Sequence, residues 1–244
     1  MSDSEFSQLA MTHKLPKARL VDRIDYLRQQ ARGRRVVHVG FVDTGCRDMQ
    51  DQAGTWLHGH LEEVATSLVG IDVNEVGVKE AVEAGYEAYA VDCRDREAVE
   101  ALGIEPAQIV IAGEVIEHLD DPGGFLEGLH NLVAPGGMLV VTTPNAYGLF
   151  NVFASLGMRE INHPDHVVMF TWRTLSNMAA RHGWEAVETR MYVPSVKLGG
   201  GGIVARALGL LGRFVVGLER LLGRLHRPYA ADGMIVVFRQ VRDR

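Results

Sequence analysis

The sequence predicts an α/β protein with a Rossmann-like, mostly parallel sheet of seven strands and helices on both faces. A cap helix is expected at the N-terminus and a helical insert before the last strand. Two observations support this fold class: short apolar runs alternate with amphipathic segments, and two of the runs end in an aspartate. Alternating strands and helices form parallel sheets through right-handed crossovers. Ligands of such folds bind at the carboxyl ends of the strands.

The expected elements follow in chain order. The cap helix starts near Pro16 and ends at Gly33, with Leu20, Ile24 and Leu27 at helical spacing. An irregular connection is expected from Asn145 to Phe170. We expect strands at 36–40, 67–72, 87–92, 109–112, 138–143, 184–193 and 234–239, and helices at 57–66, 74–84, 122–133 and 172–182.

Length and composition exclude several classes of protein. The chain has 244 residues, 47% of them hydrophobic, and a net charge of −6, so it can form a full core and is not intrinsically disordered. The acidic balance argues against a protein that wraps duplex nucleic acid. Cys46 and Cys93 are too few for a disulfide scaffold. The first 20 residues contain no apolar stretch typical of a secretory signal, so we expect a cytoplasmic protein.

We expect residues 1–244 to form one domain. Its parts are an N-terminal cap (1–34), a core (35–193), a helical insert (194–233) and the last strand (234–244).

Candidate ligand-binding residues lie where the expected strands end. The turn after the first strand reads GFVDTG, from Gly40 to Gly45, and its glycines would let the backbone approach a ligand, although they also fit a plain turn. Asp72 ends the second strand and could accept hydrogen bonds from both hydroxyls of a ribose. Asp92 ends the third strand, where it could face an adenine amino group or simply cap a helix.

Four stretches resemble the class I S-adenosylmethionine-dependent methyltransferases: VVHVGFVDTG, SLVGID, EAYAVD and GEVIEHLDDPGGFLEGLHNLVAPGGMLVVTTPN. The similarity covers about residues 35–193 and the last strand, and it implies that the domain is a methyltransferase domain. Two departures are the glycine loop, which lacks the form G-x-G-x-G, and Gln108, which stands where the family often has an acid. The resemblance implies that S-adenosylmethionine is held by Gly40, Val42, Gly45, Asp72, Val73, Asp92, Cys93 and Gly113.

A second group of polar residues follows the fourth expected strand. Glu117 and His118 come three and four residues after Glu114, so a helical turn would place all three side chains on one face. Two carboxylates and an imidazole make a credible metal site if a fourth ligand exists. The stretch NHPDH, at 162–166, supplies two more imidazoles, of which we interpret His163 as a loop residue.

The stretches EVIEHL, TTPN and DHVVMFTWRTL resemble the small-RNA 2′-O-methyltransferases and the ubiquinone-pathway O-methyltransferases. In the RNA enzymes, an E-x-x-E-H motif and a later histidine hold a divalent ion. For this chain, the resemblance implies that Glu114, Glu117, His118 and His166 are metal ligands and that the ion is Mg²⁺. It also implies that His118, His166 and Glu117 are catalytic residues. The alternative is a site without metal, in which His118 acts alone as the base.

The predicted function is metal-assisted O-methylation of a sugar or glycan hydroxyl with S-adenosylmethionine, on a small-molecule or oligosaccharide acceptor. A divalent ion would lower the pKa of the hydroxyl, and an imidazole would take its proton. One alternative is the methylation of a quinone-type phenol or other small molecule. An alternative of another class is a non-catalytic, methyltransferase-like binding module, which the irregular glycine loop favours.

The insert carries a regular pattern of arginines. Arg206, Arg213, Arg220 and Arg227 recur every seven residues among apolar residues, so a helix would align them in one stripe. These charges argue against a transmembrane span. Two interpretations remain: a lid or homodimer helix, which we favour, and peripheral contact of residues 203–227 with a membrane surface.

Overall fold

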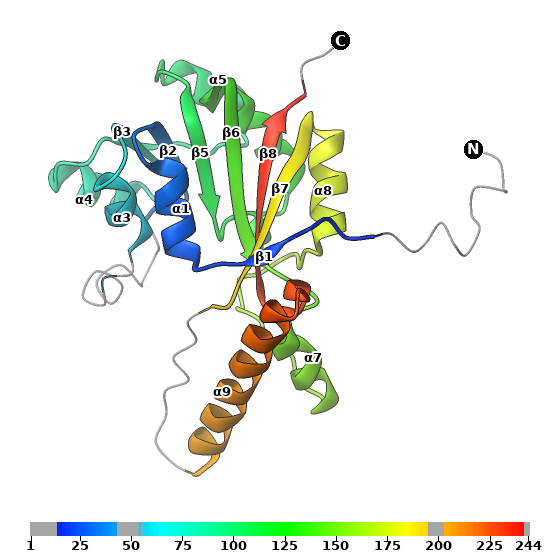
Figure 1. Cartoon of the computed structure of the whole chain (residues 1–244). Coiled ribbons are helices and arrows are strands. Elements are labelled where there is room, and N and C mark those ends of the chain that lie inside the picture. Colours follow the sequence, from blue (N-terminus) through cyan, green and yellow to red (C-terminus); the bar gives the residue numbers. More distant parts are fainter. Residues whose placement is uncertain (1–13, 43–53, 55, 195–202, 242–244) are drawn as a thin grey trace, which may run out of the picture.

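The computed structural model describes residues 14–42, 54, 56–194 and 203–241, and for 203–211 it describes the backbone alone. Its sheet confirms the predicted fold class (Figure 1). The strand order is β1-β7-β8-β6-β5-β2-β3-β4, and every neighbouring pair is parallel except those that β8 forms with β6 and β7. The strands are β1 (Arg19–Leu20), β2 (Arg35–Val39), β3 (Ser67–Asp72), β4 (Ala88–Ala90), β5 (Ala107–Gly113), β6 (Val133–Pro144), β7 (Trp184–Tyr192) and β8 (Gly233–Gln240).

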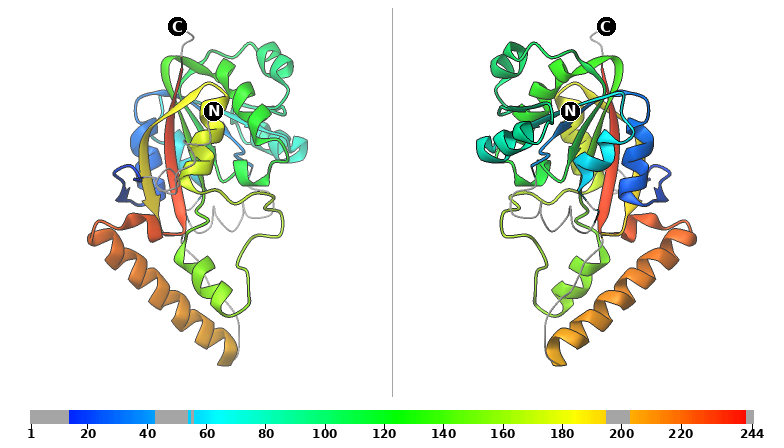
Figure 2. Two further views of the ribbon diagram at one scale, coloured as in Figure 1. Left: turned by 90° about the vertical axis from the view of Figure 1, so that its right-hand side faces the viewer. Right: turned by 90° about the vertical axis from the view of Figure 1, so that its left-hand side faces the viewer.

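Helices cover both faces of the sheet (Figure 2). The α-helices are α1 (Arg23–Ala31), α3 (Leu57–Glu62), α4 (Glu75–Glu83), α5 (Arg96–Ala101), α6 (Pro122–Gly128), α7 (Leu149–Leu156), α8 (Trp172–Arg181) and α9 (Ile203–Arg224). The described residues also form the short 3₁₀ helices η3 (Ile116–His118), η4 (Leu129–Leu132) and η5 (Pro228–Ala230).

The core has two layers because successive residues of a strand point to opposite faces. In β5, Val110 and Ala112 face the cluster that includes residues of α5, α6 and α8, whereas Ile109 and Ile111 face the cluster that includes residues of α1 and α3. A central strand buried on both faces therefore reads as one continuous apolar run, which is the pattern seen in the sequence.

The predicted strand number and cap helix need correction. The sheet has eight strands, because Arg19 and Leu20 pair with β7 instead of starting the helix. Helix α1 begins only at Arg23, because the side chain of Asp22 accepts a 3.0 Å hydrogen bond from the Asp25 N–H and caps it. Its predicted end is confirmed: Gly33 follows with φ +67°, in the left-handed region that glycine favours.

The predicted insert contains α9, which with α7 projects from the edge where β5 and β6 end (Figures 1 and 2). The sequence analysis missed α7, none of whose residues is buried. The amide of Asn145 donates to the carbonyls of Tyr229 (2.9 Å) and Ala231 (2.8 Å) and so joins the end of β6 to the segment after α9. Among the described residues, no helix is both long and apolar enough to cross a membrane.

Candidate functional site

Backbone hydrogen bonds bring together two segments that are far apart in the sequence. The carbonyl of Glu117, in η3, accepts from the N–H groups of Val167 (2.8 Å) and Val168 (3.1 Å). One ring nitrogen of His118 lies 3.2 Å from the carbonyl oxygen of Asp165. The turn after β5 is thereby fixed against the loop before α8, at the carboxyl edge of the sheet.

This contact assembles three imidazoles, from His118, His163 and His166, which we call the histidine cluster. One ligand atom from each lies within 4.8 Å of the other two. The rings of His118 and His166 are 4.6 Å apart at their centroids. His166 is oriented by Asn162, whose Oδ1 lies 2.6 Å from its Nδ1. Partial burial, followed by the neighbouring His118 and His163, lowers the pKa of His166, so its imidazole is neutral at physiological pH.

The two carboxylates of the E-x-x-E-H motif do not belong to the histidine cluster. Glu114 adopts φ +59° and accepts hydrogen bonds from the hydroxyls of Thr142 (2.7 Å) and Tyr192 (2.6 Å). Glu117 is fully buried and accepts a 3.0 Å hydrogen bond from the hydroxyl of Thr143. Burial, and then the charge of Glu114, raises the pKa of Glu117 to about 8. Both carboxylates are thus hydrogen-bonded to hydroxyls of the neighbouring strands β6 and β7.

Of the four predicted metal ligands, the structure thus brings together His118 and His166. Among the described residues, the group of possible ligands contains His163 in place of Glu114 and Glu117. The sequence analysis set His163 aside, although its position three residues before His166 was a usable signal. The roles of all these residues stay predictions.

The predicted cofactor residues lie around the ends of β2 and β3. Gly40 has φ +73°, and a Cβ there would collide with the Val115 side chain, so only glycine fits. The Asp72 carboxylate accepts hydrogen bonds from the N–H groups of Val42 (3.0 Å) and Asn74 (2.9 Å). These bonds place the carboxylate beside the glycine turn. Each of its oxygens keeps a lone pair that could accept from a ribose hydroxyl.

The other cofactor candidates are arranged differently. Asp92 forms a 2.6 Å ion pair with Arg94, and hydrogen bonds from that side chain lower its pKa. Burial raises the pKa of the Cys93 thiol to about 12, which keeps it protonated. Val73 is 66% exposed. Gly113 lies close to Arg23, where a Cβ would be only 2.8 Å from the guanidinium. Gly45 lies outside the described residues.

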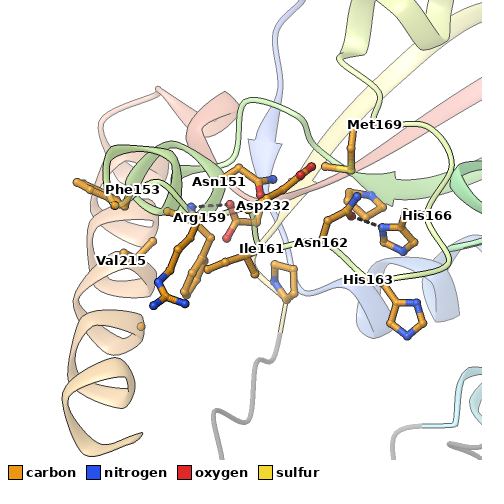
Figure 3. A pocket seen from close by; sticks show the side chains of 17 residues that line it. Asn151, Phe153, Arg159, Ile161, Asn162, His163, His166, Met169, Val215 and Asp232 are labelled. Carbon is orange, nitrogen blue, oxygen red and sulfur yellow. Dashed lines mark hydrogen bonds between the residues drawn. The ribbon is translucent and has the colours of Figure 1, made fainter. Parts of the chain in front are cut away.

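A cavity of about 880 Å³ extends from the histidine cluster to α7 and α9 (Figure 3). His163 and His166 form one side of it, and Val215 of α9 forms the other. Its lining is mainly apolar and includes Phe150, Phe153, Ile161, Met169 and Pro194. Arg159, Glu160 and Asp232 supply its charged groups.

The strand order, with an antiparallel β8, an aspartate at the end of β3 and another shortly after β4, defines a Rossmann-like methyltransferase fold of class I, the S-adenosylmethionine-dependent class. The chain belongs to the methyltransferase domain family, whose model matches residues 11–189.

Curated relatives agree with this family, and a solved structure agrees with its fold. A ubiquinone biosynthesis O-methyltransferase of Parvibaculum lavamentivorans is 30% identical over 124 residues, which are 50% of this chain and 46% of that protein. One from Ruegeria pomeroyi is 26% identical and covers 70% of this chain and 73% of its own length. The chain thus spans about half the length of the first of these relatives. A crystal structure of an S-adenosylmethionine-dependent methyltransferase from Archaeoglobus fulgidus matches with a TM-score of 0.52 and 15% identity, covering 88% of this chain and 89% of that one.

Proposed function

We propose that the chain is an S-adenosylmethionine-dependent O-methyltransferase that acts on a hydroxyl of an apolar, quinone-type phenol. The observation that carries this proposal is the large apolar cavity, which ends at two imidazoles on the edge of the sheet. The names of the curated relatives support the same acceptor class. We also propose that the whole chain forms one methyltransferase domain.

The lining of the cavity distinguishes between the two acceptor classes considered. A sugar needs hydrogen-bonding groups for several hydroxyls, since polar groups buried without a partner lose free energy. Phe150, Phe153, Ile161 and Met169 offer apolar surface instead. The cavity therefore favours a phenol with apolar substituents over the glycan hydroxyl predicted from the sequence.

The proposed reaction is a direct displacement. The acceptor oxygen attacks the methyl group of the sulfonium, the bond from sulfur to methyl breaks, and S-adenosylhomocysteine leaves. The hydroxyl proton would pass to an imidazole, either His166, which lines the cavity, or His118, whose ring lies beside that of His166. The lowered pKa of His166 keeps that ring able to accept a proton at neutral pH.

A divalent ion would be held by His118, His163 and His166 in the observed arrangement. It would supply a Lewis acid that lowers the pKa of the acceptor hydroxyl. Three imidazoles suit a transition-metal ion such as Zn²⁺ better than Mg²⁺, which prefers oxygen ligands. Magnesium, the ion expected from the resemblance, therefore does not fit the donor set that the described residues bring together.

The acceptor class can be tested by competition. We expect the protein to transfer a labelled methyl group from S-adenosylmethionine to an alkyl-substituted catechol with a kcat/KM at least about 100-fold above that for a methyl glucoside. The difference reflects about 2–3 kcal/mol from burying the alkyl substituent. The measurement is the initial rate of label transfer to each acceptor. Equal rates, or a preference for the glucoside, would contradict the phenol assignment.

The cofactor assignment depends on Asp72. Asp72→Ala is expected to weaken S-adenosylmethionine binding by about 1–3 kcal/mol, because charge-assisted hydrogen bonds to the ribose are lost. Isothermal titration calorimetry measures this change, with Glu100→Ala, which removes an exposed carboxylate of α5, as the control. Unchanged affinity in folded Asp72→Ala protein would defeat the assignment. If the wild-type protein itself binds no S-adenosylmethionine, the chain is the non-catalytic binding module instead.

A further inference from the structure

The outward face of α9 carries two parallel stripes. Arg213, Arg220 and Arg224 are all exposed, and each is followed directly by an exposed apolar residue. Successive helical residues are turned by about 100°, so the arginines form one stripe and the apolar residues form its neighbour. The apolar stripe consists of Phe214 (61% exposed), Leu221 (50%) and Leu225 (60%). The opposite face of the helix, at Val215 and Glu219, is buried.

Helix α7 adds to this exposed apolar surface. Val152 is 45% exposed and Leu156 78%, and in the loop that follows Met158 is 94% and Ile161 56% exposed. Both helices project from the same end of the molecule (Figures 1 and 2). Segments 147–161 and 214–225 contribute eight of the fifteen exposed large hydrophobic side chains in the described part of the chain. This concentration marks a binding surface rather than scattered surface residues.

We propose that the projecting end, formed by α7, residues 157–161 and α9, binds the surface of an anionic lipid bilayer. The apolar stripe would enter the boundary between headgroups and acyl chains, and the arginine stripe would contact the lipid phosphates. The chain as a whole carries a charge of −6, so the cationic end also sets the orientation of binding. This proposal goes beyond the enzymatic one and does not depend on it.

The charge pattern favours a bilayer over a second copy of the chain. Within residues 212–225 the single acid is Glu219, and it is buried on the inward face. A two-fold contact between outward faces would therefore set arginines against arginines without carboxylates from these residues to pair with them. Anionic headgroups supply the missing negative charge. The stripe therefore supports the peripheral membrane contact that the sequence analysis left open beside a lid or homodimer helix.

Vesicle co-sedimentation of the full chain, without cofactor or acceptor, tests the proposal. We expect binding to phosphatidylcholine vesicles with about 30% phosphatidylglycerol, little binding to pure phosphatidylcholine, and weaker binding at about 500 mM salt. The triple variant Arg213→Gln, Arg220→Gln, Arg224→Gln should bind the anionic vesicles about 100-fold more weakly. Phe214→Ser with Leu221→Ser should also lose binding. The matched control Arg96→Gln, Arg173→Gln, Arg181→Gln removes the same charge elsewhere and should bind like wild type.

Three outcomes would overturn the proposal. The first is absence of wild-type binding to the anionic vesicles. The second is equal loss in the two arginine variants, since this would mean that only total charge matters. The third is a wild-type dimer in analytical ultracentrifugation that the Phe214→Ser, Leu221→Ser variant converts to a monomer, since this would assign the face to a second copy. Circular dichroism confirms that each variant is folded. Methyl transfer to a soluble catechol is measured separately, so a failure of vesicle binding leaves the proposed enzymatic function untouched.

Discussion

Replacing His118 by alanine is expected to lower the kcat of methyl transfer by about 10²–10⁴-fold, the usual contribution of a general base. The affinity for S-adenosylmethionine should stay unchanged, because His118 lies at the histidine cluster and not at the Asp72 turn. The measurements are single-turnover rates at saturating cofactor and calorimetric affinities for the same variant. A control is His226→Asn, which changes an exposed imidazole at the end of α9.

The same experiment separates a metal site from a metal-free base. If the histidine cluster holds an ion, Ala at His118, His163 or His166 should each cause losses of similar size, since ligands act as a unit. Excess chelator should then abolish transfer, and a divalent ion should restore it. In the metal-free alternative, chelator has no effect and His163→Ala is mild. Full activity of His118→Ala, both with a divalent ion and with excess chelator, would show that His118 has no role in the mechanism.

The sheet could be predicted because its strands are buried on both faces. Such strands are short apolar runs whose neighbours along the chain are amphipathic, and Ser67–Asp72 has the bounds that the pattern predicts. Elements whose form depends on tertiary contacts could not be predicted from the sequence pattern. Leu20 lies at helical spacing with Ile24 and Leu27, yet pairing with β7 makes it part of a strand. Helix α7 buries no residue, so its sequence lacks the pattern of core-facing residues that would predict a helix.

In the candidate site, too, some features could be predicted from the sequence and others depend on tertiary contacts. Spacing predicts Glu114, Glu117 and His118 on one face, and the resemblance to the small-RNA 2′-O-methyltransferases adds His166. The structure does bring His118 and His166 together. The directions of Glu114 and Glu117 depend instead on Thr142, Thr143 and Tyr192, which lie 26 to 78 residues away in the sequence. Local spacing places side chains on a common face only if the turn is a regular helix. At Glu114, φ +59° breaks that condition.

A pair of acids, the buried Glu219 and the half-buried Asp232, joins α9 to the start of α7. Glu219 is 1% exposed and lies against Asp232, whose carboxylate accepts a 3.0 Å hydrogen bond from the Phe150 N–H. Burial, and then the charge of Asp232, raises the pKa of Glu219 to about 8, and burial raises the pKa of Asp232 to about 6. With these pKa values, the pair carries one proton at neutral pH, on Glu219.

Glutamine at position 219 is therefore expected to change how stability depends on pH. The pKa of Glu219 rises from an ordinary 4.5 to about 8 on folding, so the folded chain binds the proton more tightly than the unfolded chain does. The contribution of Glu219 to the free energy of unfolding therefore falls as the pH rises from 4.5 to about 8. Because an amide cannot ionise, Glu219→Gln should lack this loss and exceed the wild type by on the order of 3 kcal/mol above about pH 8.

Urea unfolding at about pH 5.5 and about pH 8.5 measures the difference. Glu100→Gln, on the exposed surface of α5, is the matched control and should follow the wild type at both pH values. The test is the direction in which the difference in free energy of unfolding between Glu219→Gln and the wild type changes with pH. Because ionisation of Glu219 lowers the stability of the wild type as the pH rises, the stability of the glutamine variant relative to the wild type should increase with pH. If Glu219→Gln instead changed the stability by the same amount at both pH values, Glu219 would bind no extra proton on folding in this range, and its raised pKa would be wrong.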